Sequence, residues 1–215
     1  MSLHSPVPCT EEVLIREFRA GDETAFRMLN EQWIKRFFRV EAKDESALAD
    51  PRKTIIERGG LILIATIGGQ SVGCCALLRM SRDGEFEVAK MAVAPEHQGK
   101  NIGRRLLHTA IEEARRMRAR RLYLETNHIL KPAIRLYESL GFQHLQPTQV
   151  TPSPYDRADV YMELKLDRVS APPTKGDPSE DSYPKSQSIR SFQDWDRGTP
   201  LRSVSTRTVG NSARK

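Results

Sequence analysis

The sequence predicts an α/β domain built around a mixed β-sheet. Two apolar runs, 61–67 and 71–80, are joined by the short turn Gly68-Gly69-Gln70, which is typical of an antiparallel hairpin. Farther along the chain, strand-like runs at 86–93 and 121–126 are separated by an amphipathic helix. Hairpins early in the chain and interleaved helices late in it together indicate a mixed sheet.

The N-terminal part of this domain is expected to contain a strand and two helical segments. Residues 13–18 form the strand, and Gly21-Asp22 begins an amphipathic helix. Its apolar residues, spaced as on one helical face, are Phe26, Leu29, Trp33 and Phe37. A second helical segment covers 50–56 and stops at Gly59-Gly60, because glycine is the usual residue just after a helix.

The clearest helix in the sequence covers 101–117. One of its faces is apolar and the opposite face carries Arg and Glu. The apolar residues are Ile102, Leu106, Leu107, Ala110, Ile111, Ala114 and Met117. This pattern predicts a helix that covers one face of the sheet.

The C-terminal part of the domain contains one more helix and two more strands. Pro132 begins the helix and Gly141 ends it, which are the usual positions of these two residues. Strands are expected at 142–145 and 159–166, with a proline-rich loop between them. These elements complete the α/β pattern.

The composition changes at both ends of this pattern. Residues 1–12 contain no basic segment followed by an apolar run, so we expect a flexible arm and not a secretory signal. Residues 168–215 are rich in Ser, Pro and Arg, carry nine basic and five acidic groups, and show no apolar period. We therefore expect a folded domain at 13–167, followed by a disordered basic tail.

Charge and cysteine usage exclude several classes of protein. Of the formal net charge of +6, most lies in the tail, so a nucleic-acid partner is not expected. There is no apolar run of about 20 residues, which excludes a membrane span. Three cysteines without a Cys-x-x-Cys motif or a His cluster argue against a disulfide framework and a metal site. A cytoplasmic location follows as the default.

The segment that links strand 86–93 to helix 101–117 predicts an anion-binding turn. It has the sequence Gln98-Gly99-Lys100-Asn101-Ile102-Gly103 and delivers several backbone N–H groups to a helix N-terminus. Lys100, Arg104 and Arg105 add positive charge. A Gly-Lys-Ser/Thr ending is missing, so the turn is not a P-loop, and a pyrophosphate is the ligand that it predicts.

Two blocks of sequence resemble the GCN5-related N-acetyltransferase (GNAT) superfamily. Gln98–Gly103 is similar to its acetyl-CoA loop, Gln/Arg-x-x-Gly-x-Gly/Ala, with Asn101 in place of the middle glycine. Asparagine adopts a left-handed backbone more easily than other non-glycine residues, so the loop shape is expected to persist. Residues 132–142 resemble the superfamily's fourth helix and its Tyr-x-x-x-Gly-Phe ending. The resemblance covers 13–166 and implies the GNAT fold, with about four helices around a mixed sheet.

The resemblance implies that acetyl-CoA is the co-substrate. In such a protein the backbone of Met91, Ala92 and Val93 pairs with the pantetheine arm like an added strand, and an N–H there faces the thioester oxygen. The turn and the helix start hold the pyrophosphate. The expected cofactor-binding residues are Met91, Ala92, Val93, Gln98, Gly99, Lys100, Asn101, Ile102, Gly103, Arg104 and Asn127.

Tyr137 is the expected general acid, because the superfamily often places a tyrosine here beside the coenzyme sulfur. A phenol with an ordinary pKa near 10 can protonate a thiolate at neutral pH. The alternative is that Tyr137 is a core aromatic, since it shares a helical stripe with Ala133 and Ile134.

Glu87 is the expected general base, because the histone-acetylating branch of the superfamily carries its base glutamate at this spacing before the coenzyme strand. Burial in an apolar strand would raise the pKa of its carboxyl toward a useful range. Three alternatives stay open: Glu87 is solvated, it pairs with Arg79 or Arg82, or an ordered water acts as base. Glu125 and His128 are weaker candidates for the base.

The resemblance implies that the residues that bind the acceptor come from the first two helices and from the loop before the last strand. Here these are Phe38, Glu41, Tyr155, Asp156 and Arg157. Glu41 or Asp156 could hold an ammonium group and Arg157 a carboxylate, or each could be a surface charge.

We therefore expect an N-acetyltransferase that moves an acetyl group to a primary amine of a small or amino-acid-like acceptor, by direct attack in a ternary complex. One alternative is a protein acetyltransferase that acts on lysine or an N-terminus. Another is a non-catalytic module that binds acyl-CoA. The superfamily often dimerises, so a homodimer is possible, and no membrane partner is expected.

Overall fold

The computed structural model of the chain describes residues 12–150, 153 and 155–166. The tail expected at 168–215 and nearly all of the arm expected at 1–12 lie outside the described residues.

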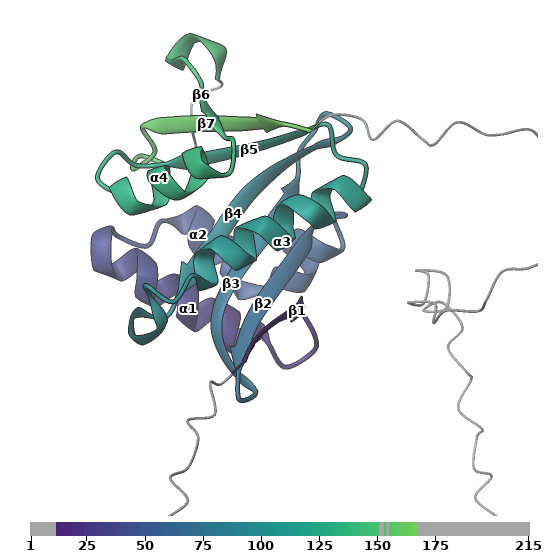
Figure 1. The fold of residues 1–215 in the computed structure, drawn as a ribbon, viewed down its shortest axis with the longest axis vertical. Helices are drawn as coiled ribbons and strands as arrows, with labels where there is room; N and C mark the ends of the chain where they lie inside the picture. Colours follow the sequence, from purple (N-terminus) through teal and green to yellow (C-terminus); the bar gives the residue numbers. More distant parts are fainter. Residues whose placement is uncertain (1–11, 151–152, 154, 167–215) are drawn as a thin grey trace, which may run out of the picture. The chain divides into compact units, whose positions relative to one another are not determined.

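The described residues form a seven-stranded mixed sheet (Figure 1) with the order β1-β2-β3-β4-β5-β7-β6. Strands β4 and β5 run parallel, and the other neighbouring strands run antiparallel. This confirms the predicted mixed α/β architecture. The strands are β1 (Val13–Glu17), β2 (Leu61–Ile67), β3 (Gln70–Arg79), β4 (Glu85–Val93), β5 (Arg121–Thr126), β6 (Gln143–His144) and β7 (Val160–Lys165).

Four α-helices flank the sheet in the described part of the chain. They are α1 (Glu23–Phe37), α2 (Ala42–Ala49), α3 (Ile102–Arg116) and α4 (Lys131–Ser139). The sequence pattern predicted α1, α3 and α4 but not α2. The helical segment expected at 50–56 is a short π-helix, Arg52–Ile56, directly after α2.

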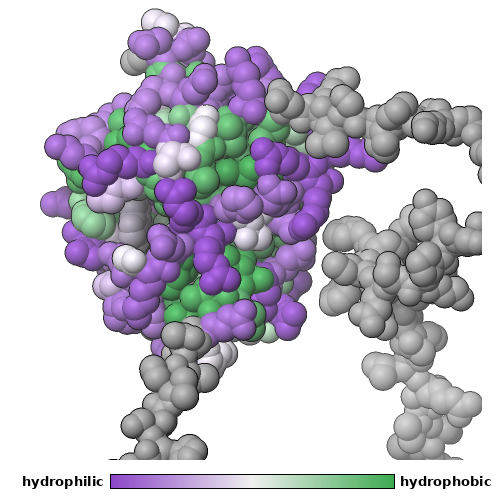
Figure 2. Space-filling model, in the orientation of Figure 1, coloured by the Kyte–Doolittle hydropathy of each residue, from purple (hydrophilic) through white to green (hydrophobic). Residues whose placement is uncertain are grey.

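Two hydrophobic cores lie on the two faces of the sheet. Helices α3 and α4 cover one face, and α1, α2 and the π-helix cover the other. The adjacent residues Cys74 and Cys75 on β3 belong to different cores, so their thiols point to opposite faces, as expected. Figure 2 shows the α3 side, where a band of hydrophilic side chains crosses the molecule with hydrophobic patches on either side.

Strand β4 is irregular in its pairing with β3. Ala76 pairs with Ala89 whereas Cys74 pairs with Ala92, so β4 contains one extra residue, a β-bulge. Within it Lys90 has a left-handed backbone, with φ of 50°.

Strands β4 and β5 pair over a short stretch and then separate. The pairing covers Glu85–Glu87 on β4 and Arg121–Tyr123 on β5. Beyond it the edge of β4 that contains Met91–Val93 has no partner strand on the β5 side among the described residues. The split leaves backbone donors and acceptors free for a ligand that lies along β4.

Candidate active site

A groove of about 470 Å³ lies at the N-terminus of α3, between the end of β4 and α4. The first backbone hydrogen bond of α3 runs from Arg105 N to Asn101 O. The N–H groups of Ile102, Gly103 and Arg104 therefore have no acceptor within the helix, and they add to the positive end of the helix dipole. This end of the groove suits a phosphate group.

The loop that leads into α3 has the shape expected of it. Asn101 has φ of 59° and ψ of 11°, which is the left-handed conformation expected from its residue type. Gly99 also has a positive φ, 77°, and no atom lies within 4 Å of the place where its Cβ would be. A side chain at Gly99 would therefore be strained by its backbone and not by crowding.

Most of the predicted cofactor-binding residues line this groove. They are Met91, Ala92, Val93, Gln98, Gly99, Asn101, Ile102, Gly103 and Arg104. Side chains that were not predicted also line it, among them Trp33 from α1 and Arg135 from α4. Both come from helices outside the loop, and α4 supplies the opposite wall of the groove, so a motif centred on the loop could not identify these two residues.

Three basic or polar residues expected at the coenzyme are directed elsewhere. The ammonium of Lys100 lies 3.4 Å from His97 Nδ1, and Lys100 is not among the residues that line the groove. Arg105 donates to the carbonyl of Val13, 2.7 Å away on β1. The Asn127 amide donates to the Arg157 carbonyl at 2.6 Å, and this residue lines a second cavity. Arg104 is thus the one of the three loop cations that lines the groove.

This second cavity, of about 120 Å³, lies in the split between β4 and β5, on the side of the sheet that α1 and α2 cover. Trp33, Met91 and Tyr137 line both the groove and the cavity. The two spaces therefore meet at these three side chains. A ligand in the groove and a ligand in the cavity can approach each other there.

Tyr137 lies at this junction, half-buried on α4 and packed 6.0 Å from the ring of Phe142. Burial, together with the nearby Cys75 thiol, raises the pKa of its phenol above the ordinary value. The hydroxyl therefore keeps its proton at neutral pH. Tyr137 is both a core contact and a wall of the site, so the two interpretations of the sequence are compatible.

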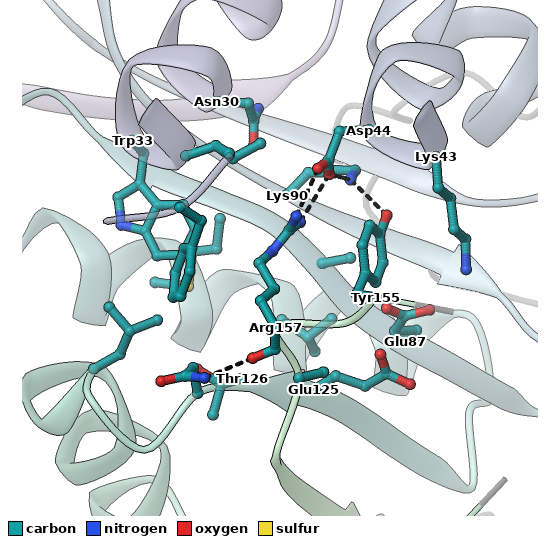
Figure 3. A pocket seen from close by; sticks show the side chains of 18 of the residues that line it. Asn30, Trp33, Lys43, Asp44, Glu87, Lys90, Glu125, Thr126, Tyr155 and Arg157 are labelled. Atoms are coloured by element: carbon teal, nitrogen blue, oxygen red, sulfur yellow. Dashed lines mark hydrogen bonds and ion pairs between the residues drawn. The ribbon is translucent and has the colours of Figure 1, made fainter. Parts of the chain in front are cut away.

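Glu87 faces the cavity from β4 (Figure 3), and no hydrogen bond or ion pair with another described residue holds its carboxylate. Arg79, a partner considered from the sequence, pairs with Asp83. Burial raises the pKa of the Glu87 carboxyl to about 7; the negative charge of Glu125 acts in the same direction, and Lys43 and Lys90 oppose it. A carboxyl with this pKa can exchange a proton near neutrality.

The two weaker base candidates have different surroundings. Glu125 also lines the cavity, and it accepts hydrogen bonds from the Tyr123 hydroxyl, at 3.1 Å, and from the Ser153 hydroxyl. The exposed His128 is paired with Asp159 and is not among the residues that line the cavity.

Asp44, on α2, is the centre of a buried ion-pair network that the sequence did not reveal. Its carboxylate is fully buried and accepts from Lys90, at 2.7 Å, and from both Arg157 Nη atoms, at 2.8 and 2.9 Å. Lys90 also donates to the Tyr155 hydroxyl at 2.9 Å. The network ties α2 to the β4 bulge and to the loop before β7.

The predicted acceptor residues converge on this network, but the charges of Glu41 and Arg157 are already paired. Arg157 donates to Glu41 at 2.8 Å as well as to Asp44, and the Asp156 backbone N–H donates to Glu41 at 3.3 Å. Phe38, Tyr155 and Arg157 line the cavity, whereas Glu41 lies behind Arg157 and does not. Independent roles for Glu41 as an ammonium ligand and Arg157 as a carboxylate ligand therefore do not fit this geometry.

The ring of Tyr155 is surrounded by three cations. Lys43, Lys90 and Arg157 lie 5.0, 5.1 and 4.4 Å from its centroid. Cation–π attraction adds to the ion pairs in holding this ring in the cavity wall. Lys43 is the exposed member of the three and extends toward Glu87 and Glu125 (Figure 3).

Two absences hold for the described part of the chain. No cluster of His, Cys, Asp or Glu there has the arrangement of a metal site. None of its helices is long and apolar enough to cross a membrane.

The sequence is similar to known acetyltransferases. The sequence model of the Acetyltransferase (GNAT) family matches residues 25–142. An uncharacterized N-acetyltransferase of Schizosaccharomyces pombe is 29% identical over 147 residues, which is 66% of this chain and 88% of that protein. The uncharacterized N-acetyltransferase YjgM of Escherichia coli is 43% identical over 79 residues, 37% of this chain and 46% of that protein.

A solved structure has the same fold. YncA of Salmonella typhimurium, determined with its cofactor acetyl-CoA, is 27% identical and superimposes with a TM-score of 0.57 over 76% of this chain and 99% of that one. The family model covers more than half of the chain and includes both the anion-binding loop and Tyr137. The chain therefore belongs to the GNAT family and is an acetyltransferase that uses acetyl-CoA.

Proposed function

We propose that this protein acetylates the primary amine of a small acceptor that enters the cavity between β4, β5 and α2. Acetyl-CoA supplies the acetyl group as a thioester. The groove residues at the start of α3, with the free edge of β4, would hold it so that its acyl end reaches the junction at Trp33, Met91 and Tyr137. Holding both substrates at one junction removes most of the entropic cost of their encounter.

Glu87 and Tyr137 fit the two proton transfers that this reaction needs. Glu87 takes a proton from the acceptor ammonium, directly or through one water, because its carboxyl has a pKa of about 7. The new bond joins the amine nitrogen to the acyl carbon, and the bond from that carbon to sulfur breaks. The nitrogen releases its second proton to solvent as the amide forms. Tyr137 donates its phenolic proton to the departing thiolate. Exchange with solvent then returns a proton to Tyr137 and removes the one on Glu87.

The bridge formed by Arg157 is the observation that favours a small acceptor. Arg157, in the loop before β7, bonds to Glu41 and Asp44 at α2. These bonds connect the two walls of the cavity that α2 and this loop form. The cavity is small, with a volume of about 120 Å³ against about 470 Å³ for the neighbouring groove. An extended peptide would have to break this bridge in order to enter, whereas a small amine would not.

The proposal is tested by an acceptor panel, with Glu87→Gln as the diagnostic variant. We expect thiol release from acetyl-CoA with small amines or amino acids and a much lower kcat/KM with peptides. In the wild type, kcat/KM should fall as the pH decreases through about 7, because Glu87 becomes protonated. Glu87→Gln should lose this acid limb and lower kcat by about 100-fold.

Glu138→Gln is a matched control, because Glu138 is exposed and bonds to His144 outside both pockets. It should keep the pH profile of the wild type. A preference for peptides over every small amine would contradict the proposed acceptor class. An acid limb that persists in Glu87→Gln would assign the base to another group or to water.

A further inference from the structure

Three carboxylates line the cavity. Asp44 is held in the ion-pair network, and the other two, Glu87 and Glu125, have opposite environments. Glu87, on β4, pairs in register with Tyr123 on β5, and Glu125 lies two residues farther along β5. Both side chains line the same cavity and lie next to each other there, near Lys43 (Figure 3). Tyr123 and Ser153 both donate to Glu125, whereas no described residue donates to Glu87.

Hydrogen-bond donors decide which of two neighbouring carboxylates keeps its charge. A carboxylate that accepts hydrogen bonds is stabilised in its ionised form, and one without donors in a partly buried site is more easily protonated. Two like charges close together cannot both be retained at low cost, so the proton goes to the group without donors. In this pair that group is Glu87.

We propose that Glu125 is a positioning residue whose carboxylate, held by two hydroxyl donors beside Glu87, directs the proton of the acceptor ammonium onto Glu87. This inference rests on the proposed function, in which Glu87 is the base. It gives Glu125 a role other than that of an alternative base, because its oxygens are occupied by the Tyr123 and Ser153 hydroxyls. The negative charge of Glu125 also attracts the cationic acceptor toward Glu87.

Other charged groups face the pair from each neighbouring element, and they do not remove this asymmetry. Lys90 and Arg157 are bound to Asp44, so their charges are largely compensated within the network. Lys43 is the exposed cation that extends toward both carboxylates. The groups that face Glu87 are Lys43 and Asp44 from α2, Lys90 from β4, Tyr123 and Glu125 from β5, and Tyr155 and Arg157 from the loop before β7.

The test is the protonation of Glu87 itself, followed by carboxyl ¹³C NMR of the full chain labelled at glutamate, with the Glu87 signal assigned through Glu87→Gln. In the wild type its midpoint should lie at about 7. In Glu125→Gln it should move to lower pH by about one unit, because the neighbouring negative charge is gone. Glu125→Asp keeps the charge and should keep the midpoint near that of the wild type.

The pH dependence of kcat/KM gives a second readout. Each enzyme is compared with its own plateau value of kcat/KM at high pH. At one pH unit below the wild-type midpoint, the fraction of this plateau that remains should be about fivefold larger in Glu125→Gln than in the wild type. Glu112→Gln, a neutralised carboxylate on the exposed face of α3, is the control for a general charge effect and should leave the midpoint unmoved. A midpoint unchanged in Glu125→Gln, or moved equally in Glu112→Gln, would overturn the role of Glu125.

The NMR titration needs no acceptor, so the two proposals can fail separately. A shifted midpoint in Glu125→Gln, together with an acid limb that persists in Glu87→Gln, would retain the coupled pair and reject Glu87 as the base. An unchanged midpoint in Glu125→Gln, together with an acid limb that is lost in Glu87→Gln, would support Glu87 as the base and reject the role of Glu125.

Discussion

Replacing Tyr137 with phenylalanine is expected to lower kcat by about 100-fold, because the thiolate then departs without a proton donor. The ring packing against Phe142 is kept, and so is the wall that Tyr137 forms between the groove and the cavity. Affinity for acetyl-CoA and the KM for the amine should therefore change little. Steady-state thiol release gives kcat, and calorimetric titration with acetyl-CoA gives the affinity.

Tyr161→Phe is the matched control for this variant. The Tyr161 hydroxyl donates to the Ala158 carbonyl at 3.2 Å, and Tyr161 is not among the residues that line either pocket. It should leave kcat unchanged. If Tyr137→Phe kept the kcat of the wild type, the phenol would not be the acid, and Tyr137 would be a packing residue at the junction.

Replacing Asp44 with asparagine should give the largest loss of stability, about 3–5 kcal/mol in the free energy of unfolding. The exchange preserves shape but leaves two cations next to a neutral amide. The Lys90 side chain is 6% exposed, so solvent compensates its charge poorly, and Arg157 keeps Glu41 as its remaining acidic partner. Urea denaturation followed by circular dichroism measures the change.

Asp83→Asn is the control, because it removes an exposed ion pair with Arg79 and should cost at most about 1 kcal/mol. A second variant tests the mechanism. Adding Lys90→Met to Asp44→Asn removes the most deeply buried uncompensated cation and should recover part of the stability. If Asp44→Asn were no less stable than Asp83→Asn, the network would not contribute to the fold.

The ion pairs of Asp44 should also make the free energy of unfolding depend on pH. Burial raises the pKa of the Asp44 carboxyl, but hydrogen bonds from Arg157 and Lys90 outweigh burial and hold the pKa below its ordinary value of 3.8. The stabilisation is therefore fully present above pH 3.8 and is lost as the pH falls through the lower value of the folded state. Asp44→Asn should show a smaller loss of stability in this acidic range than the wild type.

The parts of the site that the sequence predicted are those encoded by contiguous residues. The anion-binding turn is a strand, a loop and a helix start in immediate succession, so its composition is sufficient to predict it. Tyr137 and Glu87 were predicted from their positions relative to such motifs. Asn101 adopts the left-handed backbone that its residue type suggested.

Helix α2 was not predicted, because one of its two buried residues is charged. Its buried positions are Asp44 and Leu48, one helical turn apart. An apolar period cannot be recognised when a carboxylate occupies one of two core-facing positions. Only its partners on β4 and in the loop before β7 explain why that carboxylate is buried.

The sequence placed Glu41 and Arg157 in one site but not in one ion pair. Their separation along the chain is 116 residues, and the bond between them depends on how α2 and the last loop meet. The β4 bulge at Lys90 is similar, since lysine has no special preference for a left-handed backbone. Such features depend on tertiary packing, which periodicity and motifs do not report.

The divergence of β4 from β5 also affects the mechanics of the domain. Three residue pairs connect the half-sheet of β1–β4 to the half-sheet of β5–β7. A coenzyme bound as proposed, along the free edge of β4, would connect these two halves. A ligand that binds only the native form at 100 times its Kd adds about 2.7 kcal/mol to the free energy of unfolding. The domain should therefore resist unfolding more strongly with acetyl-CoA bound, because in the proposed binding mode the coenzyme takes the place of a strand beside β4.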